Sequence, residues 1–239
     1  LGGSLRYLRA VKDQDELSLI AEAVRISEQA LGETLAKGLV GRREIDVAFD
    51  LECAMRALGA SGPSFETIVA SGPRSAMPHG AASEKVIQAD EPVVIDYGCI
   101  YKGYCSDQTL TVCTGNLGGE FEAAYRCVLE AQKRGIGALA PGKKTAEVDA
   151  GAREYLDQNG YGRYFGHSLG HGVGMEVHEM PTLSTVSKDT LEDGMVVTIE
   201  PGVYLPGKFG IRLEDVFVIT DSSCMRITNI DKEAITVIR

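Results

Sequence analysis

The stretch VVIDYGCIYKGYCSDQTLTV, residues 93–112, predicts an antiparallel β-hairpin with two acidic side chains on one face. Runs at 92–98 and 103–113 have the composition of strands, and a short turn joins them. Opposed residues in such a hairpin have a constant index sum, which is odd for a two-residue turn. Asp96 and Asp107 differ in parity, so they then share a face, whereas a three-residue turn or a bulge would separate them.

The same succession of elements is predicted twice along the chain. The predicted elements are helices at 14–37, 44–58, 119–139 and 145–158, and strands at 65–70, 92–98, 103–113, 195–200, 210–219 and 234–238. The two helix pairs align so that Gly59 matches Gly160, and the following strands keep the same order. We therefore expect one α/β domain over residues 1–239, with an internal duplication of roughly 14–113 and 119–220.

The composition predicts a soluble globular protein whose partners are neither nucleic acid nor membrane. Hydrophobic residues make up 44% of the chain, while the net charge of −10 disfavours polyanionic partners. No apolar stretch approaches the ~18 residues at which a membrane helix is expected. The six cysteines form no Cys-x-x-Cys pair, which is typical of reduced, mostly buried thiols in a cytoplasmic protein.

Four carboxylates stand in apolar, strand-like surroundings. Asp96 and Glu200 each follow an apolar run, and Asp107 and Glu214 lie within the next predicted strand of each half. Carboxylates gathered in a core are costly unless they are protonated, paired or metal-bound. Their summed charge of −4 would be cancelled by two divalent cations. Each carboxylate alone is more simply a cap, a turn residue or a surface ion-pair partner.

The histidines are few and clustered. Three of the four fall between His167 and His178, and His171 lies in a glycine-rich run at 166–174. Imidazole is the commonest metal ligand near neutral pH, and glycines let the backbone approach a ligand closely. Four carboxylates and one imidazole form an oxygen-rich set, which suits Mn²⁺ and similar ions better than a thiolate-type zinc site does. The combination favours a metal centre over independent structural roles.

Five motifs containing glycine, histidine and acidic residues occur in order along nearly the whole chain. They are Ser71-Gly72-Pro73 with Pro78-His79-Gly80, Asp96-Tyr97-Gly98 with Gly103-Tyr104-Cys105-Ser106-Asp107, Gly170-His171-Gly172-Val173-Gly174 with Val177-His178-Glu179, Ile199-Glu200-Pro201-Gly202, and Ile211-Arg212-Leu213-Glu214-Asp215. This series resembles the pita-bread metallopeptidases, in the branch of the Xaa-Pro aminopeptidases and prolidases (proline dipeptidases). The resemblance implies two pseudo-symmetric αβ halves around a curved, mainly antiparallel sheet.

The resemblance also implies a ligand set for two divalent metal ions. Asp96 would hold one metal, Asp107 and Glu214 would bridge both, and His171 and Glu200 would complete the other. Mn²⁺ is the expected ion, with Co²⁺ and Zn²⁺ as alternatives. The implied substrate is a peptide with proline at the second position, cleaved at its N-terminus or as an Xaa-Pro dipeptide.

The implied reaction is attack of a metal-bridging hydroxide on the carbonyl of the Xaa–Pro bond, a tertiary amide without an N–H. Glu200 would pass the water proton to the proline nitrogen. His178 would stabilise the oxyanion and His79 would hold the substrate. Arg212 shares a strand face with Glu214 and would orient a ligand carboxylate. His167 is predicted to brace its loop through local hydrogen bonds.

Two features depart from the family pattern. Leu110 stands where many relatives carry Arg, which predicts that a local salt bridge is missing. The sequence begins just before the first predicted helix, whereas most proline-specific relatives have an N-terminal domain of roughly a hundred residues or more. We therefore expect that domain to be absent from this chain, which leaves substrate length and homodimer formation open.

Three alternatives compete with an Xaa-Pro peptidase. A methionine aminopeptidase shares the ligands, but the run Arg212-Leu213-Glu214-Asp215 looks more like the proline-specific branch. A non-catalytic binding module on the same fold would be favoured by lost ligands, yet all five positions are filled. A creatinase-like hydrolase works without metal and typically lacks this full set. The filled positions therefore favour the metallopeptidase.

Overall fold

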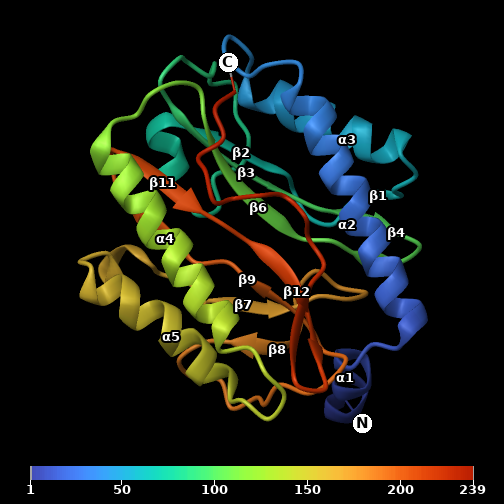
Figure 1. Cartoon of the computed structure of the whole chain (residues 1–239). Coiled ribbons are helices and arrows are strands. Elements are labelled where there is room, and N and C mark those ends of the chain that lie inside the picture. Colours follow the sequence, from blue (N-terminus) through green and yellow to red (C-terminus); the bar gives the residue numbers. More distant parts are fainter. Residues whose placement is uncertain (1, 239) are drawn as a thin grey trace.

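The computed structural model describes residues 2–238 and shows two helix pairs flanking a set of antiparallel strands (Figure 1). Helices α2 (Gln14–Leu35) and α3 (Glu44–Ala57) form one pair, and α4 (Gly119–Gly137) and α5 (Thr145–Gln158) form the other. All four were predicted, with ends that agree to within two residues. The short helix α1 (Gly2–Ala10) was not predicted.

The strands form four sheets, and every pairing between named strands in residues 2–238 is antiparallel. They are β1 (Gly62–Pro63), β2 (Ile68–Ser71), β3 (Pro92–Tyr97), β4 (Cys99–Tyr101), β5 (Tyr104–Cys105), β6 (Gln108–Cys113), β7 (Gly170–Gly172), β8 (Glu179–Leu183), β9 (Val196–Ile199), β10 (Gly202–Leu205), β11 (Phe209–Arg212), β12 (Asp215–Thr220) and β13 (Ser223–Arg226). The larger sheets have the orders β2-β3-β6 and β13-β12-β9-β7-β8, and the smaller ones β1-β4-β5 and β10-β11. The mixed α/β class with antiparallel sheets is therefore confirmed.

Two predicted strands are each broken in the middle, at an acidic residue. The strand predicted at 103–113 is β5 followed by β6, and the one at 210–219 is β11 followed by β12. Asp107 and Glu214 occupy the breaks. There the backbone leaves its ladder and bonds elsewhere, because Glu214 N donates to the carbonyl of Thr109 at 3.1 Å. This bond connects β6 to the residue before β12 and so joins the two larger sheets next to Asp107 and Glu214.

The remaining strand predictions were partly wrong. The strand predicted at 65–70 is shifted to β2, and 234–238 forms no named strand but a single bridge from Val237 to Cys113. Strands β1, β4, β7, β8, β10 and β13 were not predicted. They are five residues or shorter, and β1, β7 and β10 contain glycine, so their apolar alternation is too brief to recognise.

Each helix pair packs its apolar face on the strands of its own part of the chain. Leu31 of α2 and Leu51 of α3 share a buried cluster with Ile95 of β3, among others. Phe121 of α4 shares a second cluster with Ile199 of β9. A single domain with an internal duplication stays a prediction, to which these two clusters give support. A capping box begins α2, because Asp13 and Glu16 exchange side-chain and backbone hydrogen bonds.

Gln132 of α4 is buried and holds the two segments that precede the glutamates of the predicted metal site. Its Nε2 lies 3.2 Å from the carbonyl oxygens of both Ile199 and Leu213, and 3.0 Å from Oδ2 of Asp215. Substituting Gln132→Leu removes a donor from these buried acceptors. We expect the free energy of unfolding to fall by about 1–3 kcal/mol, measured by urea denaturation.

A matched control lies on the same helix. Glu120 forms an ion pair with Lys208, and both side chains are more than half exposed. Glu120→Gln should change stability by less than about 0.5 kcal/mol. Equal effects of the two substitutions would show that the Gln132 hydrogen bonds contribute nothing specific.

Candidate metal centre

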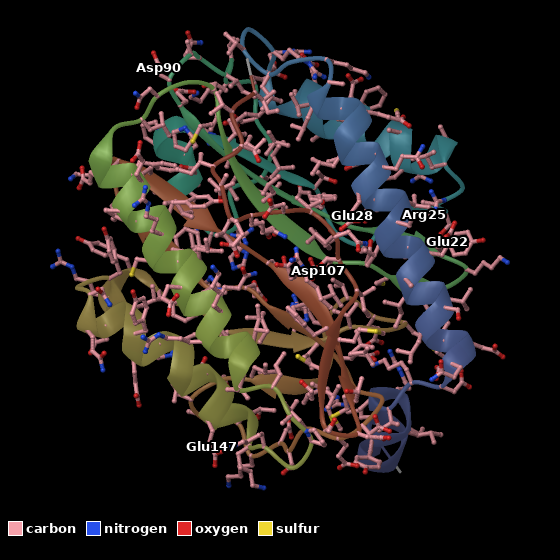
Figure 2. All side chains as sticks on the ribbon, viewed as in Figure 1. Glu22, Arg25, Glu28, Asp90, Asp107 and Glu147 are labelled. Atoms are coloured by element: carbon pink, nitrogen blue, oxygen red, sulfur yellow. The ribbon has the colours of Figure 1, made fainter. Side chains whose placement is uncertain are left out.

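The predicted site residues line one cavity of about 820 Å³ where the two larger sheets meet. Its wall includes every predicted ligand and every predicted catalytic residue: His79, Asp96, Asp107, His171, His178, Glu200, Arg212 and Glu214. His167 lines it as well. Asp107 lies near the middle of the molecule, between the two helix pairs (Figure 2). Residues far apart in the sequence thus meet at one cavity, although their individual roles stay predictions.

The first hairpin has the register that the sequence predicted for a two-residue turn. Tyr101 pairs with Tyr104 and Asp96 with Thr109, so the index sum is odd. The turn residues, Lys102 and Gly103, have φ of 47° and 90°, the left-handed conformation that such turns require. Asp96 and Asp107 consequently reach the same side of the hairpin.

In the second half, the register places the two glutamates opposite each other. Ile199 pairs with Asp215 on one side, and Gly202 pairs with Arg212 on the other. Glu200 and Glu214 occupy the gap between these pairs. The backbone N–H of Glu200 donates to the carbonyl of Leu169 at 2.8 Å, which brings this gap beside β7.

His171 enters the cavity from β7 with one ring nitrogen held by backbone. Its Nδ1 is 3.1 Å from the carbonyl oxygen of Gly172, while Nε2 lies 3.2 Å from Glu200 Oε1 and 3.4 Å from Asp107 Oδ2. An N–H at Nδ1 that donates to the carbonyl leaves the lone pair of Nε2 facing the carboxylates. This is the orientation in which metal-binding imidazoles are usually held.

Three sets of side chains are close enough to share an ion. They are Asp96 with Asp107 and Glu214, His171 with Glu200 and Glu214, and Asp107 with His171 and His178. The ligand atoms within each set lie within 4.8 Å of one another. Asp107, His171 and Glu214 each belong to two sets, and the two carboxylates among them are the residues predicted to bridge.

Two buried carboxylate oxygens test whether divalent cations fit this centre. Asp96 Oδ2 accepts a bond from Arg212 Nη2 at 2.6 Å, and Glu214 Oε2 accepts one from the hydroxyl of Thr109 at 2.8 Å. The other oxygen of each, Asp96 Oδ1 and Glu214 Oε1, is buried without a hydrogen-bond partner in the described residues. A buried oxygen without a donor is costly. A cation would satisfy both, so the residues present fit the predicted metals.

Burial and mutual repulsion strongly perturb the acidic groups. Burial raises the pKa of Asp107 and of Glu214 well above the ordinary range, and neighbouring carboxylates raise each further. The pKa of Asp96 is raised too, by burial and by Glu200 against the opposing charge of Arg212. Burial would also raise the pKa of Glu200, but the hydrogen bond to His171 and the nearby charges of His171, His167 and Arg212 together outweigh burial, so that pKa is lowered. Two divalent cations would offset the repulsion between the carboxylates and favour their ionised forms.

The metal-free protein is expected to lose stability as pH rises. The raised pKa values of Asp107 and Glu214 mean that the unfolded chain releases these protons near pH 4, before the folded chain does. Stability therefore falls above pH 4 until the folded pKa is passed, by up to about 1.4 kcal/mol per pH unit for each group. Glu200, with its lowered pKa, contributes constant stability across pH 5.5–8.

The measurement is Tm at pH 5.5 and pH 8, with EDTA and with MnCl₂. Because cations remove the carboxylate repulsion, the Tm gained on adding metal should be larger at pH 8 than at pH 5.5. A gain that is independent of pH would contradict the interpretation. NaCl at the same ionic strength distinguishes binding at this centre from general salt effects.

Arg212 connects carboxylates that come from different hairpins. Its guanidinium donates to Asp96, to the hydroxyl of Thr109 at 3.0 Å and to the hydroxyl of Tyr204 at 2.8 Å. Thr109 in turn donates to Glu214. The contact with Asp96 supports the orienting role proposed for Arg212, which stays a prediction. Thr109 and Tyr204 were not predicted as partners of Arg212. Thr109 could have been found, because the hairpin register places it opposite Asp96.

The histidines occupy different environments around the cavity. The ring nitrogens of His167 lie 2.8 Å from the carbonyl oxygen of Ser168 and 2.9 Å from the hydroxyl of Tyr204, in agreement with the predicted bracing role. His178 is exposed, with its ring centroid 4.2 Å from that of His171. His79 is also exposed at the cavity wall.

Leu110, expected to mark a missing salt bridge, is an ordinary core residue. It is buried on β6 and belongs to the cluster formed with α2 and α3. The cysteines are all free, with four buried, as the sequence predicted. No helix in residues 2–238 has both the length and the apolarity that crossing a membrane would require.

Buried carboxylates gathered with one imidazole, where antiparallel sheets meet in an α/β fold, are the arrangement typical of a metal-dependent hydrolase. Comparison with known protein families agrees with this class and narrows it to one family. Residues 18–221 match the model of metallopeptidase family M24, so the chain belongs to that family.

Relatives and solved structures agree on the branch of the family. The chain is 44% identical to a Xaa-Pro dipeptidase of Pyrococcus furiosus over 96% of its own length, and 46% identical to the uncharacterized peptidase YqhT of Bacillus subtilis over 97%. It spans 66% of the length of each relative. All of this chain superposes on 67% of an X-Pro aminopeptidase structure from Thermotoga maritima, with 42% identity and a TM-score of 0.97.

The prolidase structure from Pyrococcus furiosus gives a TM-score of 0.95 at 43% identity, over 97% of this chain and 68% of that one. These superpositions confirm the predicted pita-bread fold. They also confirm the predicted resemblance to the Xaa-Pro aminopeptidase and prolidase branch.

Proposed function

We propose that the protein is a metal-dependent peptidase that hydrolyses the Xaa–Pro bond at the N-terminus of peptides or in Xaa-Pro dipeptides. The observation that carries the proposal is the pair of buried, unpartnered oxygens of Asp96 and Glu214 inside a centre of four carboxylates and one imidazole. The names of the relatives support the proline-specific branch. No observation favours the methionine aminopeptidase or a non-catalytic module.

We further propose that two Mn²⁺ ions occupy the centre, held by Asp96, Asp107, His171, Glu200 and Glu214. The support is chemical, because carboxylate oxygens dominate the set and no cysteine of the described chain lines the cavity. When bound, two such cations lower the pKa of a shared water and polarise the scissile carbonyl. The free thiols and the net charge of −10 support a cytoplasmic location without nucleic-acid partners.

The protein's own groups would supply the remaining chemistry. Glu200 has a lowered pKa and is therefore ionised near neutral pH, ready to accept a proton from water and pass it to the proline nitrogen. His171 Nε2 lies 3.2 Å from Glu200 Oε1, so the two groups face one point and would hold the same cation. His178 would donate to the oxyanion, and His79 would hold the carbonyl of the residue before proline.

The cavity also offers apolar surface for the substrate. Phe65, Ile68 and Met180 line it together with the ring of Tyr204. A pyrrolidine ring has no N–H to satisfy and packs well on such side chains. All of these apolar side chains come from one chain.

The proposal is tested by metal analysis combined with a panel of Xaa-Pro peptides of increasing length. We expect the manganese-loaded protein to cleave Ala-Pro peptides and to leave Met-Ala peptides nearly intact, with kcat/KM values at least about 10²-fold apart. Rapid Met-Ala turnover with inert Ala-Pro would replace the proposal with a methionine aminopeptidase. The length series shows whether dipeptides or longer chains are preferred.

A further inference from the structure

A buried cluster of charges lies at one edge of the cavity, outside the predicted ligands. Lys12 Nζ donates to Glu179 Oε1 at 2.6 Å, and the two side chains are only 1% and 7% exposed. Arg9 of α1 donates to the other oxygen, Oε2, at 2.8 Å. Lys12 also donates to the carbonyl of Ala10 at 3.1 Å. Both oxygens of Glu179 are therefore fixed, and both by cations from the N-terminal part of the chain.

Glu179 directly follows His178 and is the first residue of β8, where the loop from β7 ends. The other side of this loop is fixed as well, because the N–H of Cys105 donates to the carbonyl of Gly174 at 2.8 Å. Gly174 packs closely against the charge cluster, and a Cβ there would lie 2.3 Å from Glu179 Oε1. The loop that carries His178 is thus anchored beside Asp107 at one end and at Lys12 at the other.

The strand ladder alone does not fix His178. His171 pairs with Thr182 but Gly172 pairs with Glu179, so the register shifts between these two positions. The His178 side chain is exposed, and packing therefore restrains it less than it restrains His171. Its ring nevertheless lies within reach of Asp107 and His171. The placement of the ring therefore depends on the backbone of His178. The next residue, Glu179, holds that backbone in place through its hydrogen-bonded carboxylate.

A buried ion pair is a weak source of stability, since apolar residues of similar volume often serve equally well. Its particular contribution is geometry, because two charge-assisted hydrogen bonds fix both oxygens of one carboxylate. We propose that Lys12 and Arg9 clamp Glu179 and thereby position His178 at the metal centre. Glu179 is then a positioning residue that acts through His178. The inference rests on the proposed function, in which His178 takes part in catalysis.

The kinetic test is a double-mutant cycle on the manganese-loaded full chain, with an Ala-Pro peptide as substrate. We expect Glu179→Gln to lower kcat by about 10- to 100-fold, the usual effect of losing a supporting contact, with metal content and KM little changed. In a His178→Ala background, the same substitution should change kcat by less than about 2-fold, because its route of action is gone. A purely structural role would give equal losses in both backgrounds and would overturn the inference.

A second readout needs no activity. The chain has four histidines, so the ring signals of the metal-free protein can be assigned by NMR. In Glu179→Gln we expect the signals of His178 to shift or broaden while those of His79 stay in place. Unchanged His178 signals would overturn the inference. If the wild type does not cleave Ala-Pro, the proposed function fails, and the NMR result still decides the positioning role.

Controls keep the outcome interpretable. Lys12→Arg retains a buried cation and should restore most of the kcat that Lys12→Met loses. If Glu179→Gln does not fold, Arg9→Gln replaces it, because Arg9 is 36% exposed and its removal leaves the buried Lys12 contact intact. Glu120→Gln, at the exposed pair with Lys208, should leave both kcat and the His178 signals unchanged.

Discussion

Glu200→Gln is expected to lower kcat by about 10²- to 10⁴-fold, the range that loss of a general base produces. The amide keeps the shape of the carboxylate and an oxygen for a metal, but it cannot accept the water proton. Wild-type Glu200 is predisposed to this task, because, in spite of burial, its pKa is lowered by His171 and the nearby charges of His167 and Arg212. Steady-state kinetics on Ala-Pro peptides measures the loss, and elemental analysis shows whether the metals remain.

A matched control is Glu147→Gln. Glu147 is exposed on α5, away from the residues that line the cavity and outside every predicted ligand set. We expect its kcat within about 2-fold of the wild type, since surface substitutions away from the reacting groups usually have small effects. Near-normal turnover of a fully metal-loaded Glu200→Gln would refute the proton-transfer role.

Removing the metals is expected to abolish activity. Metal polarisation and water activation are worth several kcal/mol, so exhaustive chelation should lower the rate by at least about 10³-fold. Mn²⁺ or Co²⁺ added after removal of the chelator should restore it. The assay is Ala-Pro hydrolysis by protein whose metal content is measured at every step.

The control for chelation is structural. Circular dichroism at pH 6, where the carboxylate repulsion is smaller than at pH 8, should show that the metal-free chain is still folded. Activity that survives complete removal of metal would point instead to the creatinase-like alternative, which works without metal.

The fold was predictable where local patterns are long. Helices α2 and α4 have sustained apolar faces, and α2 also has the Asp13–Glu16 capping box. The odd register of the first hairpin followed from the two residues between Tyr101 and Tyr104. The sequence did not reveal β7, because three residues with two glycines carry no periodicity. Its pairing with β8 and β9 depends on contacts far apart in the sequence.

The candidate site was also predictable only in part. His171 and the carboxylates could be recognised from the sequence, because histidines are scarce and the acidic residues stand in apolar surroundings. The groups that hold them could not, since Tyr204 and Glu179 look unremarkable until the fold brings Arg212 and Lys12 to them. Supporting contacts are long-range, and no local spacing encodes them.

The bond between Glu214 and Thr109, which joins the two larger sheets, has a consequence for the order of folding events. Asp96 and Asp107 come from one sheet region and Glu214 from the other, so the set that they form exists only after the two regions have docked. For a folding transition state in which the two regions have not yet docked, a cation bound there would act mainly on the rate of unfolding. It would lengthen the lifetime of the native state and leave the rate of folding almost unchanged.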